Sequence, residues 1–373
     1  MWDPVNTGTR LQSLTWDDSN TWEDKNWKAG VIRVYREYLI AMDVTKASVE
    51  NHRLIAWSTS AVPGTIPSTW DKDDITEDAG ETELAETNGS LIDGLSLGDI
   101  FVIYKQDAIW AMQYTGGVNI FRFYQLFSNI GILSRRCVKE FEGKHFVLTN
   151  GDVVVHDGAT LDSVIDEKRR NEFFNNIDAN NYQRCYVAPN YINQEMWVCY
   201  PSSGSLFPDR AMVWNWTNNS WGDRDLPSAP HIGFGVVNDS NEVTTWDADT
   251  GLWNDDTTTW NAKNFNPTDR RMLMAAGSAL YLVDDTTQFA GVNFTGYVER
   301  TGLHFDEPEK IKYLSEVWLR ITGSGSVNVS VGTANSPDEA ISWQAAQTYT
   351  IGTDSKVNVR ASGRYLAYKI EST

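Results

Sequence analysis

A series of short β-rich runs, each joined to the next by a polar turn, fills the sequence between Asp99 and Trp221. Val, Ile, Phe, Tyr and Trp fill the runs, whereas Asn, Gly, Asp and Ser fill the turns. Branched and aromatic side chains fit the pleated, half-buried surface of a sheet, and the turn residues tolerate the tight backbone of a hairpin. This pattern predicts an all-β fold, a propeller-like array of antiparallel hairpins or blades.

Two local signals refine this prediction. Asn150-Gly151, followed by Asp152, lies between two apolar runs and predicts a two-residue hairpin turn. Residues 166–181 are the one candidate helix, and Asp166 is its expected N-cap. The basic triplet at 168–170 fits a solvated helix face, and a contact with phosphate is the alternative.

A hairpin motif with paired aromatic residues recurs along the chain. Each copy has an aromatic residue, a short polar turn, and then Trp, one further residue and Asp, as in residues 15–24, 216–223 and 246–255. A Trp on each arm of a tight hairpin can pack across the two strands. The three copies suggest an internal repeat, although their spacing is less regular than a propeller leads one to expect.

The chain is rich in aromatic residues and strongly acidic. It has 16 Trp, 15 Tyr and 14 Phe, which fit β-core packing or, alternatively, interfaces and sugar stacking. Its formal net charge is -19, which argues against binding nucleic acid by neutralising phosphates. Such a charge serves solubility, or a surface past which nucleic acid must move without adhering.

The acidic residues are densest between residues 71 and 93. Nine of them stand there against Lys72 alone, namely Asp71, Asp73, Asp74, Glu77, Asp78, Glu81, Glu83, Glu86 and Asp93. So many like charges are not expected to share a core, so this segment is predicted to be a solvated loop excursion. A calcium site is the alternative, although no ladder of alternating Asp residues ending in Gly is present.

The sequence contains no recognisable catalytic or metal-binding constellation. Its three cysteines (Cys137, Cys185 and Cys199) form no CxxC pair and are expected to be buried, inert thiols. The five histidines are scattered, as His52, His145, His156, His231 and His304. Residues 247–253 approach an Asp-box turn but are one residue short. We therefore expect no enzyme, no cofactor and no metal, and assign no site residues.

The chain is expected to contain two domains. Residues 1–302 are predicted to be the propeller-like domain, and residues 303–373 a small C-terminal β-sandwich with about five alternating strands. Neither a signal peptide nor a transmembrane span is expected, because the N-terminus lacks a basic and an apolar region and no apolar run is long enough.

Several segments resemble a group of virion structural proteins of short-tailed bacteriophages. They are residues 99–105, 110–117, 131–138, 150–158, 191–198, 213–221 and 354–365. The likeness covers most of residues 30–300 and much of 309–373. Those proteins carry a further N-terminal β-rich region, whereas this chain begins at what would be their middle. The expectation is a shortened member or a sequence lacking an upstream part, with an incomplete propeller.

The resemblance implies a tail nozzle or tail-tube subunit of the virion, synthesised in the host cytoplasm. It implies a homo-oligomeric ring, commonly a hexamer, that contacts adaptor or portal proteins and tail fibres. Double-stranded DNA would pass through without sequence-specific binding, and an acidic lumen, to which the 71–93 segment is expected to contribute, would leave that DNA mobile. No stable membrane insertion is expected.

Two other functions remain open from the sequence. One is a carbohydrate-binding or receptor-binding β-propeller module on the virion, with Trp246 and Trp253 as candidate sugar-stacking residues. The other is a glycan-cleaving enzyme, which would require a pair of carboxylates in a pocket.

Overall fold

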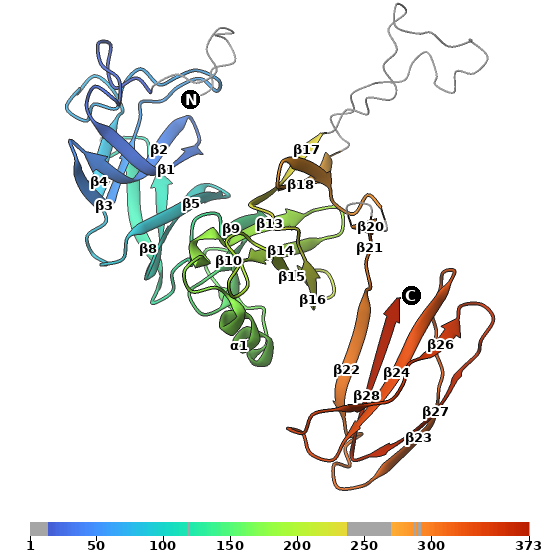
Figure 1. The fold of residues 1–373 in the computed structure, drawn as a ribbon. Helices are drawn as coiled ribbons and strands as arrows, with labels where there is room; N and C mark the ends of the chain where they lie inside the picture. The colour runs from blue at the N-terminus through green and yellow to red at the C-terminus, as the bar shows by residue number, and fades with distance from the viewer. Residues whose placement is uncertain (1–13, 118, 237–269, 287, 290–291, 373) are drawn as a thin grey trace, which may run out of the picture. The chain divides into compact units, whose positions relative to one another are not determined.

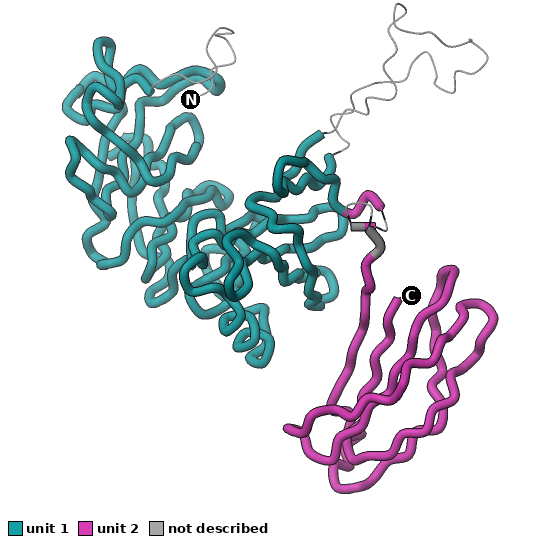
Figure 2. Tube along the Cα trace, in the orientation of Figure 1, with its two compact units in different colours: residues 1–283 teal, residues 284–373 magenta. Residues whose placement is uncertain are grey.

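The computed structural model describes residues 14–117, 119–236, 270–286, 288–289 and 292–372 (Figure 1). The regular structure of this part is almost entirely β, with one α-helix and one 3-10 turn. The chain divides into two compact units, residues 1–283 and residues 284–373 (Figure 2). Each unit has its own core and is described separately below.

Unit 1 is built from consecutive antiparallel meanders, numbered here as sheets 1 to 5. Sheet 1 holds β1 (Trp27–Tyr35), β2 (Tyr38–Lys46), β3 (Val49–Trp57) and β4 (Gly80–Glu83). Sheet 2 holds β5 (Leu91–Leu97), β6 (Ile100–Lys105), β7 (Ala108–Tyr114) and β8 (Phe121–Ser128). Sheet 3 holds β9 (Val138–Phe141), β10 (Lys144–Leu148), β11 (Val153–His156) and β12 (Leu161–Ser163). Sheet 4 holds β13 (Tyr186–Asn190), β14 (Glu195–Tyr200), β15 (Arg210–Asn215) and β16 (Ser220–Asp225). Sheet 5, as described, holds β17 (His231–Val236), β18 (Arg270–Ala276) and β19 (Ala279–Leu282).

The five sheets meet through their first strands. β1 contacts β5, β5 contacts β9, β9 contacts β13, and β13 contacts β17. Four-stranded meanders that repeat along the chain and contact one another through equivalent strands have the radial repetition of propeller blades. The all-β, propeller-like fold predicted from the sequence is confirmed.

Burial on both faces explains the continuous apolar runs of the middle strands. In sheet 3, Val153, Val154 and Val155 are all buried, because side chains on both faces pack against neighbouring sheets. Phe146 of β10 stacks on Trp214 of β15 with ring centroids 5.4 Å apart. Such strands show unbroken runs rather than the alternation of a half-exposed sheet.

The predicted hairpin turn is confirmed, and so is the helix with its N-cap, but the helix ends at Asn176 and does not extend to residue 181. Asn150 and Gly151 form the turn between β10 and β11, whose strands pair from Leu148 with Val153 outward. The helix α1 (Glu167–Asn176) begins after Asp166, whose side chain accepts a hydrogen bond from the backbone N–H of Arg169. The helix lies between sheets 3 and 4 along the chain, and η1 (Tyr182–Arg184) follows it.

The repeated Trp motif forms hairpins, with one change of partner. Trp221 pairs across the strands with Trp214, not with Trp216 as the motif suggested. Trp216 instead lies against Phe141 and donates a 3.1 Å hydrogen bond to Glu142. In the first copy Thr15 bridges to Thr21, and both Trp16 and Trp22 are buried. The third copy, with Trp246 and Trp253, lies outside the described residues.

The C-terminal unit is a two-layered β-sandwich. One sheet holds β22 (Tyr297–Leu303), β24 (Ser326–Ala334), β25 (Ser342–Trp343), β26 (Gln347–Thr350) and β28 (Tyr365–Ser372), and the other holds β23 (Lys312–Val317) and β27 (Val357–Gly363). A short pair, β20 (Gln288–Phe289) and β21 (Val292–Asn293), precedes them. The core lies between the two layers, where Val329 and Val331 pack with Val357 and Val359. The predicted sandwich is therefore present.

The boundary between the units lies earlier than the sequence suggested. The prediction placed it after residue 302, in the Gly-rich and Pro-containing stretch before the tail. That position cuts through β22, which pairs with β28 from Tyr297 to Leu303 and so belongs to the sandwich. The compact units divide between Val283 and Asp284. Because β22 and β28 are about seventy residues apart in the chain, no local sequence pattern can predict that they pair.

Candidate functional site

Two of the five histidines come together in a buried group. His145 of β10 and His156 of β11 are cross-strand partners, and both flank the hydroxyl of Tyr104. That hydroxyl lies 2.7 Å from His145 Nδ1 and 2.6 Å from His156 Nε2. All three side chains are buried. These histidines look scattered in the sequence, yet each lies five residues from the Asn150-Gly151 turn, and that symmetry indicates a cross-strand pair.

The contacts determine which atom donates and which atom accepts in each hydrogen bond of this group. His145 Nε2 lies 2.9 Å from the carbonyl of Ser96 and must donate to it, so its Nδ1 accepts from Tyr104. The Tyr104 oxygen then accepts from His156 Nε2, and His156 Nδ1 has no hydrogen-bond partner among the described residues. Burial lowers the pKa of both imidazoles to about 4 and raises the pKa of Tyr104. The group is thus neutral and closed to solvent.

The three cysteines are buried thiols, as predicted. Burial raises the pKa of Cys137 and of Cys199 to about 12, and raises that of Cys185 as well. Cys137 Sγ lies 3.1 Å from the hydroxyl of Ser134. A buried thiol with a raised pKa is a poor nucleophile. Within the described ranges, no group of three or more His, Cys, Asp or Glu side chains is placed to hold a metal ion.

A cluster of charged side chains lies where the first strands of the sheets meet. It consists of Arg33 on β1, Asp93 on β5, Arg136 just before β9, Lys139 on β9 and His231 on β17. We call these five residues the first-strand charge cluster. The Arg33 guanidinium forms hydrogen bonds of 2.9 Å to both carboxylate oxygens of Asp93. The backbone N–H of Arg136 donates to Asp93 Oδ2 at 2.8 Å.

Asp93 corrects the prediction for the acidic segment. The sequence predicts that Asp93 lies with eight other acids in a solvated loop excursion, but its side chain is only 1% exposed. Two Arg33 bonds, the Arg136 N–H and its neighbour Gly94 N–H satisfy its carboxylate. A buried carboxylate is stable when it is paired and hydrogen-bonded in this way. Its position on an inner strand, not its neighbours in sequence, decides its environment.

The rest of the acidic segment is a loop only in part. Residues 80–83 form β4 of sheet 1 and residues 91–93 begin β5 of sheet 2, so the predicted loop excursion over 71–93 is wrong there. Glu81 is paired with Lys46 and Lys72, and Glu83 with Arg53. Six others make no ion pair among the described residues, namely Asp71, Asp73, Asp74, Glu77, Asp78 and Glu86. They lie in the connection between β3 and β4 or in the turn after β4. This connection carries the concentrated negative charge of the unit.

The basic triplet at the start of α1 is used within the fold. Arg169 lies 2.9 Å from Asp223 on β16, and Arg170 lies 3.7 Å from Asp152. Its arginines therefore act as partners for nearby carboxylates. The phosphate contact considered from the sequence gains no support from these contacts.

Exposed apolar side chains gather in one stretch at the start of the C-terminal unit. They are Phe294, Tyr297, Val298, Phe305, Ile311, Tyr313 and Trp318. Tyr313 is 84% exposed, and Trp318 is 64% exposed. Two of the strands in this stretch, β22 and β23, are edge strands. Among the described strands β22 pairs only with β28, and β23 pairs only with β27. Single exposed apolar residues are ordinary, whereas a contiguous apolar patch marks an interface. Here the exposed side chains are close in sequence and lie on β22, on β23 and in the segments around them.

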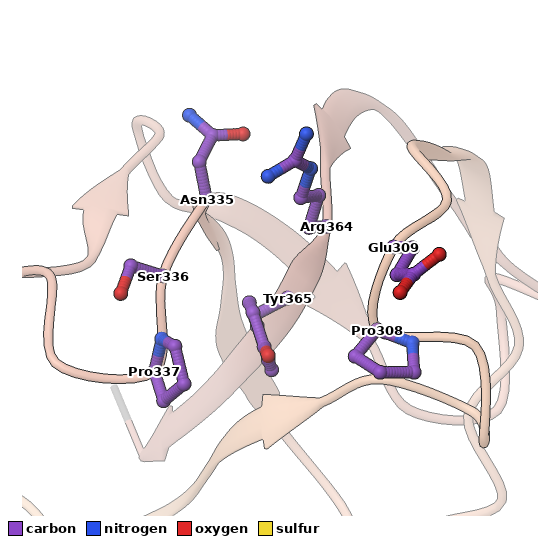
Figure 3. A pocket seen from close by; sticks show the side chains of 7 residues that line it. All are labelled: Pro308, Glu309, Asn335, Ser336, Pro337, Arg364 and Tyr365. Atoms are coloured by element: carbon purple, nitrogen blue, oxygen red, sulfur yellow. The ribbon is translucent and has the colours of Figure 1, made fainter.

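The same unit carries an open pocket of about 600 Å³. Its lining residues are Pro308, Glu309, Asn335, Ser336, Pro337, Arg364 and Tyr365. Figure 3 shows the Tyr365 ring between the two prolines, with the polar groups of Arg364, Asn335 and Glu309 around it. The His304 ring meets the ring of Tyr365 edge-on at 6.2 Å. An aromatic ring bordered by polar groups is one arrangement that can hold a sugar.

No family model matches the chain, and no curated protein does. Solved structures give remote likenesses. The N-terminal domain of Nup159 is 12% identical, with 97% of this chain and 93% of that chain covered and a TM-score of 0.31. An exo-beta-1,3-galactanase from Phanerochaete chrysosporium is 9% identical over 96% and 95%, with a TM-score of 0.28. AztD from Citrobacter koseri is 13% identical over 52% and 59%, with a TM-score of 0.28. Likenesses of this size carry no functional argument.

None of the helices in the described residues has the length and apolar character needed to span a membrane.

Proposed function

We propose that the chain is a non-enzymatic structural subunit of a short-tailed phage tail, of the nozzle or tail-tube type, and assembles as a homo-oligomeric ring. The exposed apolar stretch between Phe294 and Trp318 carries this proposal, because it leaves large side chains in water that a neighbouring subunit would cover. Aromatic anchors of this kind dominate the energy of protein interfaces. The sequence resemblance supplies the tail assignment, and a hexamer is the favoured ring.

The distribution of charge supports a conduit for DNA. Six carboxylates between β3 and β4 or just after β4 have no ion-pair partner in the described part of the chain, and the chain as a whole carries a net charge of -19. Negative charge facing a channel would repel phosphates and leave passing double-stranded DNA mobile. In this proposal the ring contacts adaptor or portal proteins on one side and tail fibres on the other, within the virion.

The ring is tested by removing apolar side chains from the exposed stretch. Ile311→Ser and Tyr313→Ser together are expected to convert the ring to monomers, since each anchor lost from an interface costs about 2 kcal/mol or more. Mass photometry reads the change, and cryo-electron microscopy of the wild type should display a closed ring with a pore that admits duplex DNA. Both residues are exposed in the single chain, so the fold should survive.

A matched control comes from unit 1. Val62→Ser and Ile75→Ser remove side chains that are 71% and 97% exposed, and this pair should leave the ring intact. A wild-type chain that stays monomeric at high concentration would contradict the proposal, as would equal dissociation of the two double variants.

The alternative function is a carbohydrate-binding or receptor-binding module on the virion. The Tyr365 pocket is the observation that favours it, because the ring and its polar neighbours could stack on and hydrogen-bond to a sugar. A glycan array probed with the wild type and with Tyr365→Ala tests it. Retention that the substitution abolishes would favour this alternative, whereas no retention would remove it.

A further inference from the structure

Two Asn-Gly pairs in unit 1 share one local sequence but lie in different surroundings. Thr87-Asn88-Gly89 follows β4, and Thr149-Asn150-Gly151 joins β10 to β11. Both asparagines are exposed. In an Asn-Gly pair the glycine nitrogen can attack the carbonyl carbon of the asparagine side chain, because glycine carries no Cβ to hinder the approach. The three residues are identical in the two pairs, so any difference in this reactivity must come from the fold.

The backbone nitrogen of Gly89 is restrained. Its N–H donates a 2.8 Å hydrogen bond to Oδ2 of Asp107, which lies in the turn between β6 and β7. The attack requires this nitrogen to lose its proton, and a carboxylate acceptor stabilises the protonated N–H form. The surroundings are also crowded, because a Cβ on Gly89 would stand 2.3 Å from Oδ1 of Asp107. The hydrogen bond and the crowding both oppose ring closure at Asn88.

The backbone nitrogen of Gly151 lacks both restraints. Its N–H lies 3.5 Å from the hydroxyl oxygen of Thr149, which is longer than an ordinary N–H···O hydrogen bond. Apart from the chain neighbours, no described atom lies within 4 Å of the place where a Cβ would stand on Gly151. The Asn150 amide donates a 3.0 Å hydrogen bond to the carbonyl of Gln106, and one exposed hydrogen bond contributes little net stability. The reacting groups of this pair are therefore free to meet in water.

We propose that Asn150 is a site of spontaneous deamidation in the folded protein and that the fold protects Asn88 from the same reaction. The Gly151 nitrogen gives its proton to hydroxide and bonds to the side-chain carbonyl carbon of Asn150. The carbon–nitrogen bond of the amide then breaks, and the nitrogen takes a proton from water and leaves as ammonia. Water opens the resulting succinimide ring at either carbonyl and leaves Asp or isoAsp at position 150. This inference does not depend on the proposed role in a phage tail.

The reaction would remove a contact between two sheets. Asn150 lies in a turn of sheet 3, and Gln106 lies in the turn between β6 and β7 of sheet 2. The product carboxylate cannot donate to the Gln106 carbonyl and faces its oxygen with a negative charge. Asn150→Asp should therefore have a lower thermal midpoint than the wild type. Asn88→Asp, at an exposed side chain in the matched sequence, should keep the midpoint of the wild type.

The experiment incubates the full chain at mildly alkaline pH, once folded and once in urea, and maps its proteolytic peptides by mass spectrometry against a sample taken at the start. The gain in mass when an amide becomes a carboxyl group reports conversion at each asparagine. In urea the two asparagines should convert at similar rates, because their local sequences match. In the folded protein Asn150 should convert about tenfold faster than Asn88 or more, the size of effect expected from one hydrogen bond to a charged group.

The control variant is Gly151→Ala. The site has room for a methyl group, and φ of Gly151 lies outside the left-handed region, so circular dichroism should show an unchanged fold. Conversion at position 150 should be mostly lost, because the added Cβ hinders the attack. Equal rates at the two asparagines in the folded protein would overturn the proposal, as would protection of both, or conversion that Gly151→Ala leaves unchanged. An unchanged thermal midpoint in Asn150→Asp would overturn the structural consequence.

Discussion

At the scale of single residues, the hydrogen-bond partners of a buried polar side chain determine where its protons lie. Tyr104, His145 and His156 come from two sheets and form one hydrogen-bonded group whose proton positions follow from the carbonyl of Ser96. Buried polar side chains are tolerated when such a network satisfies them. The group joins sheet 2 to sheet 3, so its protonation state bears on the stability of unit 1.

We expect stability to fall as the pH drops from about 6.5 toward 4. Both imidazoles have a pKa of about 4 when folded, against 6.5 for an ordinary histidine. Between these values the unfolded chain binds more protons than the folded chain, so stability that is fully present above about pH 6.5 is lost on acidification. Each histidine contributes about 1.4 kcal/mol per pH unit. Urea unfolding between pH 7 and 5 measures this slope.

His156→Gln isolates this contribution from those of other groups. The amide of Gln can still donate to Tyr104, but it does not titrate, so the slope should fall by about 1.4 kcal/mol per pH unit. His304→Gln, which changes a histidine of the C-terminal unit, serves as the control and should keep the slope of the wild type. An unchanged slope in the His156 variant would rule out this assignment.

At the scale of elements, the contacts among first strands hold the sheets of unit 1 together. Asp93 on β5 is bound by Arg33 of β1 and by the backbone just before β9. One carboxylate therefore links three consecutive sheets. Around it, apolar clusters fill the spaces between neighbouring sheets, as where Trp197 of β14 packs with Met272 of β18.

Asp93→Asn should destabilise unit 1. The substitution keeps the shape of the side chain but removes the charge that pairs with Arg33, whose side chain is 35% exposed. The cost is therefore expected to be smaller than that of breaking a fully buried pair, which is about 3–5 kcal/mol. Chemical denaturation with two probes, tryptophan fluorescence and circular dichroism, measures the loss. Asp99→Asn is the control, because the Asp99 side chain is 97% exposed and its ion pair with Arg36 is long, with 3.8 Å between the nitrogen and the oxygen. Similar midpoints for the two variants would refute the role given to Asp93.

At the scale of the whole molecule, the two units have separate cores. The sandwich core is formed by residues of the C-terminal unit, mostly from β23, β24, β26 and β27, and the first strand of the sandwich, β22, pairs with β28 of the same unit. A domain with its own core can in principle fold by itself.

We expect residues 284–373 expressed alone to unfold cooperatively on heating, as a β-rich protein. Thermal unfolding followed by circular dichroism tests this, with the same segment carrying Val331→Asp as the control that should not fold. A segment that begins at residue 303, as the sequence analysis placed the boundary, lacks β22 and should be less stable or unfolded. A stable 303–373 segment would count against the boundary at Asp284.

The all-β class of the fold, one hairpin turn and one helix cap could be predicted from the residues alone. The Asn150-Gly151 turn and the Asp166 cap depend on interactions within a few residues, which is why the sequence predicts them. The buried cysteines followed from composition and the lack of paired motifs.

Which distant residues share an environment depends on how the sheets pack, and no local pattern predicted it. The tertiary structure placed Asp93 in a buried ion pair, brought Tyr104 to the two histidines, gave Trp221 the partner Trp214, and moved the unit boundary ahead of β22. It also brought Arg33 and the backbone of Arg136 to one carboxylate. These outcomes depend on which strands meet, and that is set by the packing of whole sheets rather than by any local pattern.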